Sequence, residues 1–185
     1  MLQSLLGWLK RELAVADPPD PSGLWPAPRP VSLKLALPAG KLNDFIGLGD
    51  PYRVLSLLGR PDNPRPHAAD HFEYASLGLV IQGGDGLIEY FELIFQPEAI
   101  DGAVAPAQAT LQFDDGEQLR VSAQTDESAI TARFGPPVER DADEDETIAR
   151  YEMSGRLLEW EFTPQGKVKR LHVELEPSRR ATASP

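Results

Sequence analysis

Histidine and carboxylate side chains gather in one short segment of the chain. His67, Asp70 and His71 lie within five residues of one another, and this combination can ligate zinc or transfer protons. A metal site needs more converging ligands than one segment supplies, and the remaining histidine, His172, lies near the end of the chain. We therefore expect a solvated loop at residues 67–71. The alternative is an enzyme or metal protein centred on these three residues.

A second segment is strongly acidic. It has six carboxylates in eight positions, at Glu139, Asp141, Asp143, Glu144, Asp145 and Glu146. Like charges at this density repel one another, which predicts an exposed and mobile loop. The segment lacks the glycine and the distal glutamate of an EF-hand calcium loop. It either serves solubility alone or forms a docking surface for a basic protein.

The remaining motifs that could suggest catalysis are better explained as structural features. Glu159 and Glu161 flank Trp160 in the alternation of a half-buried strand, and that pattern needs no catalytic explanation. The glycine-rich residues 83–86 open a strand, so they lack the helix N-terminus that binds phosphate. The sequence contains no Walker motif and no Gly-x-Ser-x-Gly elbow. We therefore expect a protein without catalytic activity and without a cofactor.

Overall charge limits the classes of partner. The 185-residue chain has a net charge of −11, and such a field repels nucleic acid but attracts a basic protein. The absence of cysteine excludes disulfides and thiolate sites. The first residues place their charges after a short apolar stretch, the reverse of a secretory signal, so we expect a cytoplasmic protein.

An internal repeat organises the chain. Four residues of the first half recur 76 positions later, pairing Gly40, Asp50, Gly59 and Pro61 with Gly116, Asp126, Gly135 and Pro137. Further along the chain, the offset between matching residues becomes 77 and then 80. Positions expected in the core are apolar in both copies. This predicts two similar α+β modules, at residues 31–97 and 107–176, joined by a linker at residues 98–106. The repeat leaves open whether one sheet continues across both modules.

Each module is predicted to have the element order β-β-α-β-β-β, with mostly antiparallel strands and the helix across one sheet face. Asp50 and Asp126 are expected to cap the two helices, which end at Gly59 and Gly135. Residues 41–48 fit either a short helix or a strand. The closing strands are predicted at residues 72–75, 79–82 and 87–95, and at residues 148–153, 157–162 and 168–175.

Three segments lie outside the modules. Leucines at helical spacing predict an amphipathic helix over residues 1–16, which packs on its own domain or docks on a partner or membrane surface through residues 2–14. Trp8 is the expected anchor for a partner. Residues 17–30 are proline-dense and are expected to form an extended linker without helix. Residues 177–185 are expected to be a disordered tail.

The repeat unit resembles two known modules. A helix ending in Leu-Leu-Gly59-Arg-Pro61 or Arg-Phe-Gly135-Pro-Pro137, followed by Tyr74 or Tyr151 and antiparallel strands, resembles the β-lactamase-inhibitor-protein-like fold. It is also similar to the SmpA/OmlA outer-membrane lipoprotein module, and the resemblance covers about residues 31–175. It implies tandem modules that present a concave sheet to another protein. The chain has no lipidation cysteine and no disulfides, so the periplasmic or secreted function is not carried over.

These features favour a protein-binding function. We predict a small bacterial protein that binds another protein through the combined sheet surface of its modules. A specific version is an immunity or inhibitor protein that sequesters a basic partner with residues 139–146. The alternative is an adaptor or assembly factor that docks on a membrane or larger complex through its N-terminal helix. The oligomeric state is not predicted.

Overall fold

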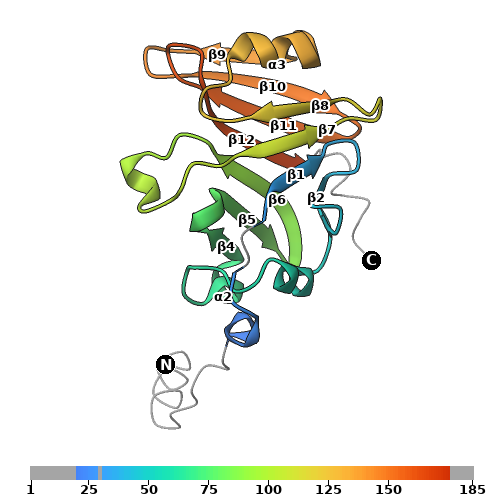
Figure 1. Ribbon diagram of the computed structural model, residues 1–185, viewed down its shortest axis with the longest axis vertical. Coiled ribbons are helices and arrows are strands. Elements are labelled where there is room, and N and C mark those ends of the chain that lie inside the picture. Colours follow the sequence, from blue (N-terminus) through green and yellow to red (C-terminus); the bar gives the residue numbers. More distant parts are fainter. Residues whose placement is uncertain (1–19, 29–30, 176–185) are drawn as a thin grey trace, which may run out of the picture.

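Two β-sheets form the framework of the protein. The computed structural model describes residues 20–28 and 31–175 (Figure 1). Strands predominate over helices in these residues, and most strand pairs are antiparallel, which confirms the predicted α+β class at this level. The predicted helix at residues 1–16, with Trp8, and the predicted tail at residues 177–185 lie outside the described residues.

The smaller sheet has five strands. Their spatial order is β3 (Ile46–Gly47), β2 (Lys41–Leu42), β1 (Leu33–Ala36), β7 (Ala109–Gln112) and β8 (Gln118–Val121). β1 and β7 are parallel, and the other neighbours are antiparallel. Residues 41–48 therefore form strands rather than a helix. The hairpin between β7 and β8 is confirmed, with Gly116 at φ +82° in its turn.

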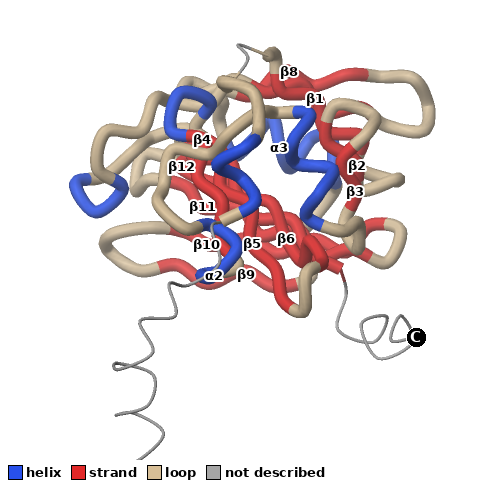
Figure 2. Tube along the Cα trace, turned by 90° about the horizontal axis from the view of Figure 1, so that it is seen from below, coloured by secondary structure: helices blue, strands red, loops and turns tan. Residues whose placement is uncertain are grey.

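The larger sheet has seven antiparallel strands. Their spatial order is β4 (His71–Tyr74), β5 (Leu79–Gly84), β6 (Leu87–Ile94), β12 (Val168–Leu175), β11 (Arg156–Phe162), β10 (Thr147–Met153) and β9 (Glu139–Ala142). The closing strands predicted in both halves of the chain are confirmed. Figure 2 shows the two sheets as layers, with β1, β2, β3 and β8 above and β5, β6, β9 and β10 below.

Both sheets continue from the first half of the chain into the second. In the smaller sheet, Leu35 pairs with Leu111, 76 residues later. In the larger sheet, Glu92 pairs with His172, 80 residues later. These separations are two of the three offsets of the sequence repeat, so these two strand pairs bring positions that match in the repeat side by side.

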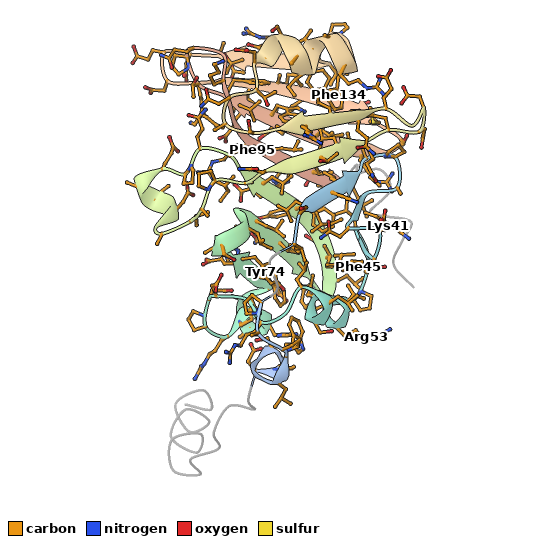
Figure 3. The ribbon with its side chains drawn as sticks, in the orientation of Figure 1. Lys41, Phe45, Arg53, Tyr74, Phe95 and Phe134 are labelled. Carbon is orange, nitrogen blue, oxygen red and sulfur yellow. The ribbon has the colours of Figure 1, made fainter. Side chains whose placement is uncertain are left out.

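One core fills the space between the sheets. It contains buried side chains from both, among them Leu35, Phe91 and Trp160. The helix α3 (Glu127–Phe134) closes this core at one end, because its Phe134 ring lies 5.5 Å from Phe113 and 6.0 Å from Trp160 (Figure 3). Aromatic side chains of this size contribute much of the apolar area that a core buries.

The first predicted helix is shorter and tighter than expected. It is the 3-10 helix η2 (Tyr52–Leu57), and its N-cap residue Pro51 cannot supply a side-chain cap. Asp50 instead accepts a hydrogen bond from the Gly47 amide at 2.7 Å. Asp126 is the N-cap residue of α3, as predicted, but its side chain makes no capping hydrogen bond, and its Oδ1 lies 2.8 Å from Lys167 Nζ. The predicted side-chain caps are therefore wrong, because both carboxylates have partners elsewhere.

The proline-rich segment is not uniformly extended. Residues 21–24 form the 3-10 helix η1 (Pro21–Leu24), with the Ser22 amide donating to Asp20 Oδ1 at 2.9 Å. A proline is tolerated in the first turn of a helix, where its missing N–H is not needed. The next residue, Trp25, stacks on Phe72 with ring centroids 6.4 Å apart. This part of the segment is thus docked on the first half of the chain.

Three further short helices connect the strands. They are α2 (Pro66–Ala69), η3 (Ala75–Leu77) and η4 (Ala99–Asp101). Within residues 20–28 and 31–175, a helix of the length and apolarity needed to cross a bilayer does not occur.

Candidate functional site

The larger sheet turns one face toward the core and the other away from it. On β6, Phe91 and Leu93 are buried in the core, whereas Tyr90 and Glu92 lie on the opposite face and are half-buried. Strand pairing aligns such residues of all seven strands in one row: Glu73, Val80, Glu92, His172, Glu159, Arg150 and Glu139. This row and its neighbours Tyr90, Glu161, Arg170 and Glu174 are called the outer face below.

Carboxylates surround the arginines of the outer face. Arg150 donates from Nη1 to Glu139 Oε2 and from Nε to Glu159 Oε2, each at 2.6 Å. The bonds to Glu139 and Glu159 raise the pKa of Arg150. The guanidinium is therefore held by two neighbouring strands, and no positive charge is left over for an acidic partner.

A second cluster surrounds Arg170. It donates to Glu92 Oε1 at 2.8 Å and to Asp101 Oδ2 at 2.7 Å, and its Nε lies 3.3 Å from Glu161 Oε2. Burial alone would lower the pKa of Arg170, but the bonds to Asp101 and Glu92 outweigh it and raise the pKa. Burial and the nearby Glu146 charge raise the pKa of Glu161. The cluster therefore holds more negative than positive charge.

An aromatic pair lies where the two halves meet on the outer face. The rings of Tyr90 and His172 are 4.3 Å apart, and the Tyr90 hydroxyl donates to Gln82 Oε1. Burial and the nearby Glu92 and Glu174 carboxylates raise the pKa of Tyr90. Tyrosine combines a large apolar surface with one polar atom, which suits it to the centre of a protein interface.

The outer face is hollowed next to Glu92. A groove of about 180 Å³ lies between the sheet and the segment that contains η4, with Val80, Ile94, Ile100 and Val104 among its lining. Ile100 is 89% exposed. The outer face therefore combines acidic side chains with apolar surface that a partner could cover.

The acidic segment is an ordered hairpin rather than a mobile loop. Glu139–Ala142 form the edge strand β9, paired with β10, and all four side chains are exposed. In the following turn, Asp143 Oδ1 accepts the amides of Asp145 and Glu146 at 2.8 and 2.9 Å, which lowers the pKa of Asp143. Repulsion between the carboxylates did not prevent order, because backbone pairing and turn hydrogen bonds fix this segment.

The carboxylates of this segment fall into two groups. Glu139 pairs with Arg150, and Glu146 Oε2 lies 2.8 Å from Lys169 Nζ. Within the described part of the chain, Asp141, Glu144 and Asp145 have no ion pair, and all three are exposed. We call residues 139–146 the acidic hairpin; it continues the outer face to its edge.

The three residues at positions 67–71 have separate partners. His67 Nδ1 lies 2.8 Å from Asp20 Oδ1, Asp70 accepts a hydrogen bond from Tyr52, and His71 Nε2 lies 2.9 Å from Glu73 Oε1. His67 also packs against the rings of Trp25, Tyr52 and Phe72. The expected solvated loop is wrong at His67, because residues 20–28 cover it. The described residues contain no group of three side chains suited to hold a metal ion.

Sequence reasoning missed the residues at the centre of the outer face. Tyr90, His172, Arg150 and Arg170 each lie in a predicted strand, at positions that alternate with buried residues. Alternation alone could have placed them on the outer side of their own strands. It could not have shown that they are neighbours, because β6 and β12 are far apart in the sequence.

Comparison with known proteins adds little to this description. Family models do not match the chain, and no curated protein matches it significantly. Among solved structures, a DUF4309 family protein, YjgB, from Bacillus subtilis subsp. subtilis str. 168 is similar at 11% identity and a TM-score of 0.43. The match covers 67% of this chain and 76% of that chain. A TM-score of this size is too low to support an argument about fold or function.

Proposed function

We propose that this protein is a non-enzymatic binding protein that sequesters a basic protein partner through the outer face of its larger sheet. The observation that carries the proposal is the charge balance of that face. Its arginines are already neutralised by neighbouring carboxylates, as in the pairs of Arg150 with Glu139 and Glu159. The acidic hairpin adds exposed carboxylates at its edge. Such a surface attracts a basic protein and speeds its association.

The centre of the face would supply affinity and the hairpin would supply steering. Tyr90 and the groove lined by Val80, Ile94 and Ile100 offer apolar surface whose burial by a partner is stabilising. Exposed charges at the rim contribute less to affinity and more to the association rate. An acidic immunity or inhibitor protein of the bacterial cytoplasm is the version of this function that we propose.

We further propose that the chain consists of two tandem modules whose sheets have merged. The pairing of Leu35 with Leu111 and of Glu92 with His172, at two of the repeat offsets, supports this organisation. Merging would give one binding surface that spans both modules. A partner that contacts both β6 and β12 would therefore need the modules together.

The test begins with affinity purification of the tagged full chain from its host, followed by measurement of the partner's affinity at two salt concentrations. Two variants probe the face: Tyr90→Ala at its centre, and Asp141→Asn, Glu144→Gln and Asp145→Asn together in the hairpin. We expect the first to raise the dissociation rate and the second to slow association and flatten its salt dependence.

A matched control removes the same number of charges elsewhere. Asp44, Asp85 and Asp114 are exposed and lie outside the acidic hairpin, and their replacement by asparagine should leave the affinity within a factor of about two. If the hairpin variant and this control behaved alike, net charge rather than the hairpin would explain the binding. Unchanged binding by Tyr90→Ala would remove the outer face from the interface.

A second candidate function rests on the docked proline-rich segment. Trp25 and Asp20 anchor residues 20–28 on the first half, at the end opposite α3 and β9 (Figure 1). Asp20, with which the described chain begins, is therefore held away from the acidic hairpin (Figure 1). An adaptor could use that arrangement to hold a basic partner while its N-terminal residues dock on a membrane or larger complex. Deleting residues 1–16 should then abolish localisation and leave the free energy of unfolding unchanged.

A further inference from the structure

The outer face of the smaller sheet has the opposite chemistry to that of the larger one. A shallow hollow of about 540 Å³ lies over β1, β7 and β8. Its ten lining residues are Ser32, Leu33, Lys34, Gln108, Ala109, Thr110, Gln118, Arg120, Val121 and Ser122. None of them is a carboxylate, although the chain has 29 Asp and Glu residues.

Two cations lie opposite each other in this hollow. Lys34 pairs with Thr110, and Thr110 pairs with Arg120, so the three residues form one cross-strand row. Neighbouring strands are about 4.8 Å apart, which puts the outer two backbones roughly 10 Å apart. Lysine and arginine side chains are long enough to converge over Thr110 from both sides.

These two cations are not neutralised. Lys34 and Arg120 are exposed, and within residues 20–28 and 31–175 neither has an ion pair. By contrast, Arg150 and Arg170 each contact two or more carboxylates. The hollow therefore has positive charge and no carboxylate in its lining, although the chain has a net charge of −11.

The donors around the two cations fit an oxyanion. Thr110 and Ser122 carry hydroxyls, and Gln108 and Gln118 carry amides that can donate. A guanidinium donates two parallel hydrogen bonds to a phosphate, and an ammonium acts as a compact second charge. A phosphate monoester offers three acceptor oxygens and close to two negative charges at neutral pH, which match this set.

We propose that the hollow formed by Lys34, Thr110 and Arg120 binds a small phosphate-bearing ligand. The ligand is small because the net charge of the whole protein repels a phosphate polymer at a distance. Its phosphate group lies over Thr110, between the two cations. This site is independent of the outer face of the larger sheet, so the two surfaces can be tested separately.

The test is a titration of the full chain with inorganic phosphate and with O-phosphoserine at constant ionic strength. The chemical shifts of the backbone amides, measured by NMR, report binding. We expect saturable shifts confined to β1, β7 and β8. Lys34→Met and Arg120→Met should each weaken phosphate binding about tenfold. Lys41→Met is the matched control, because Lys41 is an exposed lysine of the same sheet that does not line the hollow (Figure 3).

The pH dependence gives an independent readout. The second ionisation of a phosphate monoester falls near pH 6, whereas lysine and arginine stay protonated from pH 5 to pH 8. Binding should therefore weaken as the pH falls from 7.5 to 5. Tighter binding of O-phosphoserine than of inorganic phosphate would indicate that the hollow also recognises the group that carries the phosphate; equal binding would place recognition in the phosphate alone.

Three results would overturn the proposal. These are shifts that do not saturate, shifts that persist in the variant lacking both Lys34 and Arg120, and an equal loss of binding in Lys41→Met. Circular dichroism and the unfolding midpoint of each variant show whether it is folded. Because all three cations are exposed, we expect those midpoints to be unchanged.

Discussion

The segment between the helix and the closing strands is partly covered in the first half of the chain and exposed in the second. In the first half, the Arg60 amide donates to Pro26 O at 2.8 Å and His67 bonds to Asp20, so residues 20–28 pack against this segment. In the second half, the corresponding segment becomes β9, with every side chain exposed. The same segment of the repeat thus packs against residues 20–28 in the first half and exposes charged side chains in the second.

The glycines that end the two helices show the same difference. Gly59 and Gly135 both have positive φ, at +97° and +80°. A Cβ on Gly59 would meet Ala27 O at 2.7 Å and Pro28 Cα at 2.8 Å, whereas one on Gly135 would meet nothing within 4 Å. Glycine is therefore required at position 59 both by the backbone conformation and by the close approach of residues 27–28. At position 135 it is required by the backbone conformation alone.

The largest effect should come from replacing these glycines by alanine. Gly135→Ala should lower the free energy of unfolding by about 1–3 kcal/mol through backbone strain. Gly59→Ala adds a collision with residues 27–28 and should lose roughly 2–5 kcal/mol in total. Denaturant unfolding of both variants checks this order. Equal losses would mean that residues 20–28 move aside at little cost.

The next effect concerns the docked segment itself. Trp25 packs on Phe72 and His67, so Trp25→Ala should lower the free energy of unfolding by about 2–3 kcal/mol. The neighbouring Leu24 is 92% exposed, and Leu24→Ala should lose less than about 0.5 kcal/mol. Thermal unfolding measures both. If Trp25→Ala lost as little free energy of unfolding as Leu24→Ala, the contact of residues 20–28 with the first half would not stabilise the protein.

A smaller difference in the free energy of unfolding is expected between variants of one carboxylate from each half. Asp62 Oδ2 accepts the Ala75 amide at 2.8 Å, so Asp62→Ala should lose about 0.5–1.5 kcal/mol. Asp141 is exposed on β9, and Asp141→Ala should change the free energy of unfolding by less than about 0.5 kcal/mol. Urea unfolding at neutral pH distinguishes them. A larger loss at Asp141 would show that β9 needs its charges to fold and would weaken their assignment to partner binding.

The smallest effect is the pH dependence of the Asp20 contact. Burial would raise the pKa of Asp20, but hydrogen bonds from Ser22 and His67 outweigh it and lower the pKa below 3.8. A carboxyl with a lowered folded-state pKa stabilises the protein above its unfolded-state pKa, and this contribution is lost as the pH falls through the folded-state pKa. The stability advantage of the natural chain over Asp20→Asn should therefore be present at pH 6 and disappear below pH 3.8. Melting temperatures of the two proteins across this range test it, and an advantage that persists in acid would contradict it.

Local patterns predicted much of the strand content. The Asp115-Gly116 turn and the alternation on either side of it gave the hairpin of β7 and β8, and the strands that close each half fall where predicted. These features depend on residues that are near one another in the sequence. Asp126 takes the expected N-cap position of α3, but neither Asp50 nor Asp126 makes a side-chain cap, because their carboxylates bind the Gly47 amide and Lys167 instead.

The candidate site was predicted only at its edge. The acidic hairpin is conspicuous in the sequence, although its order as a strand depends on pairing with β10. The centre of the outer face was missed, because Tyr90 and His172 come together only when β6 pairs with β12. The hollow at Lys34 and Arg120 was missed for the same reason, since β1 and β8 are brought together by β7.

The sequence by itself determined strand alternation and the turns at glycines with positive φ, because local sterics control both. The tertiary structure decided which strands lie side by side, and hence which charges are neutralised. Arg150 and Arg170 acquire carboxylate partners from neighbouring strands, while Lys34 and Arg120 do not. The reason is that an ion pair depends on a separation of a few ångströms in space, which residues far apart in the sequence reach only when the sheets have formed.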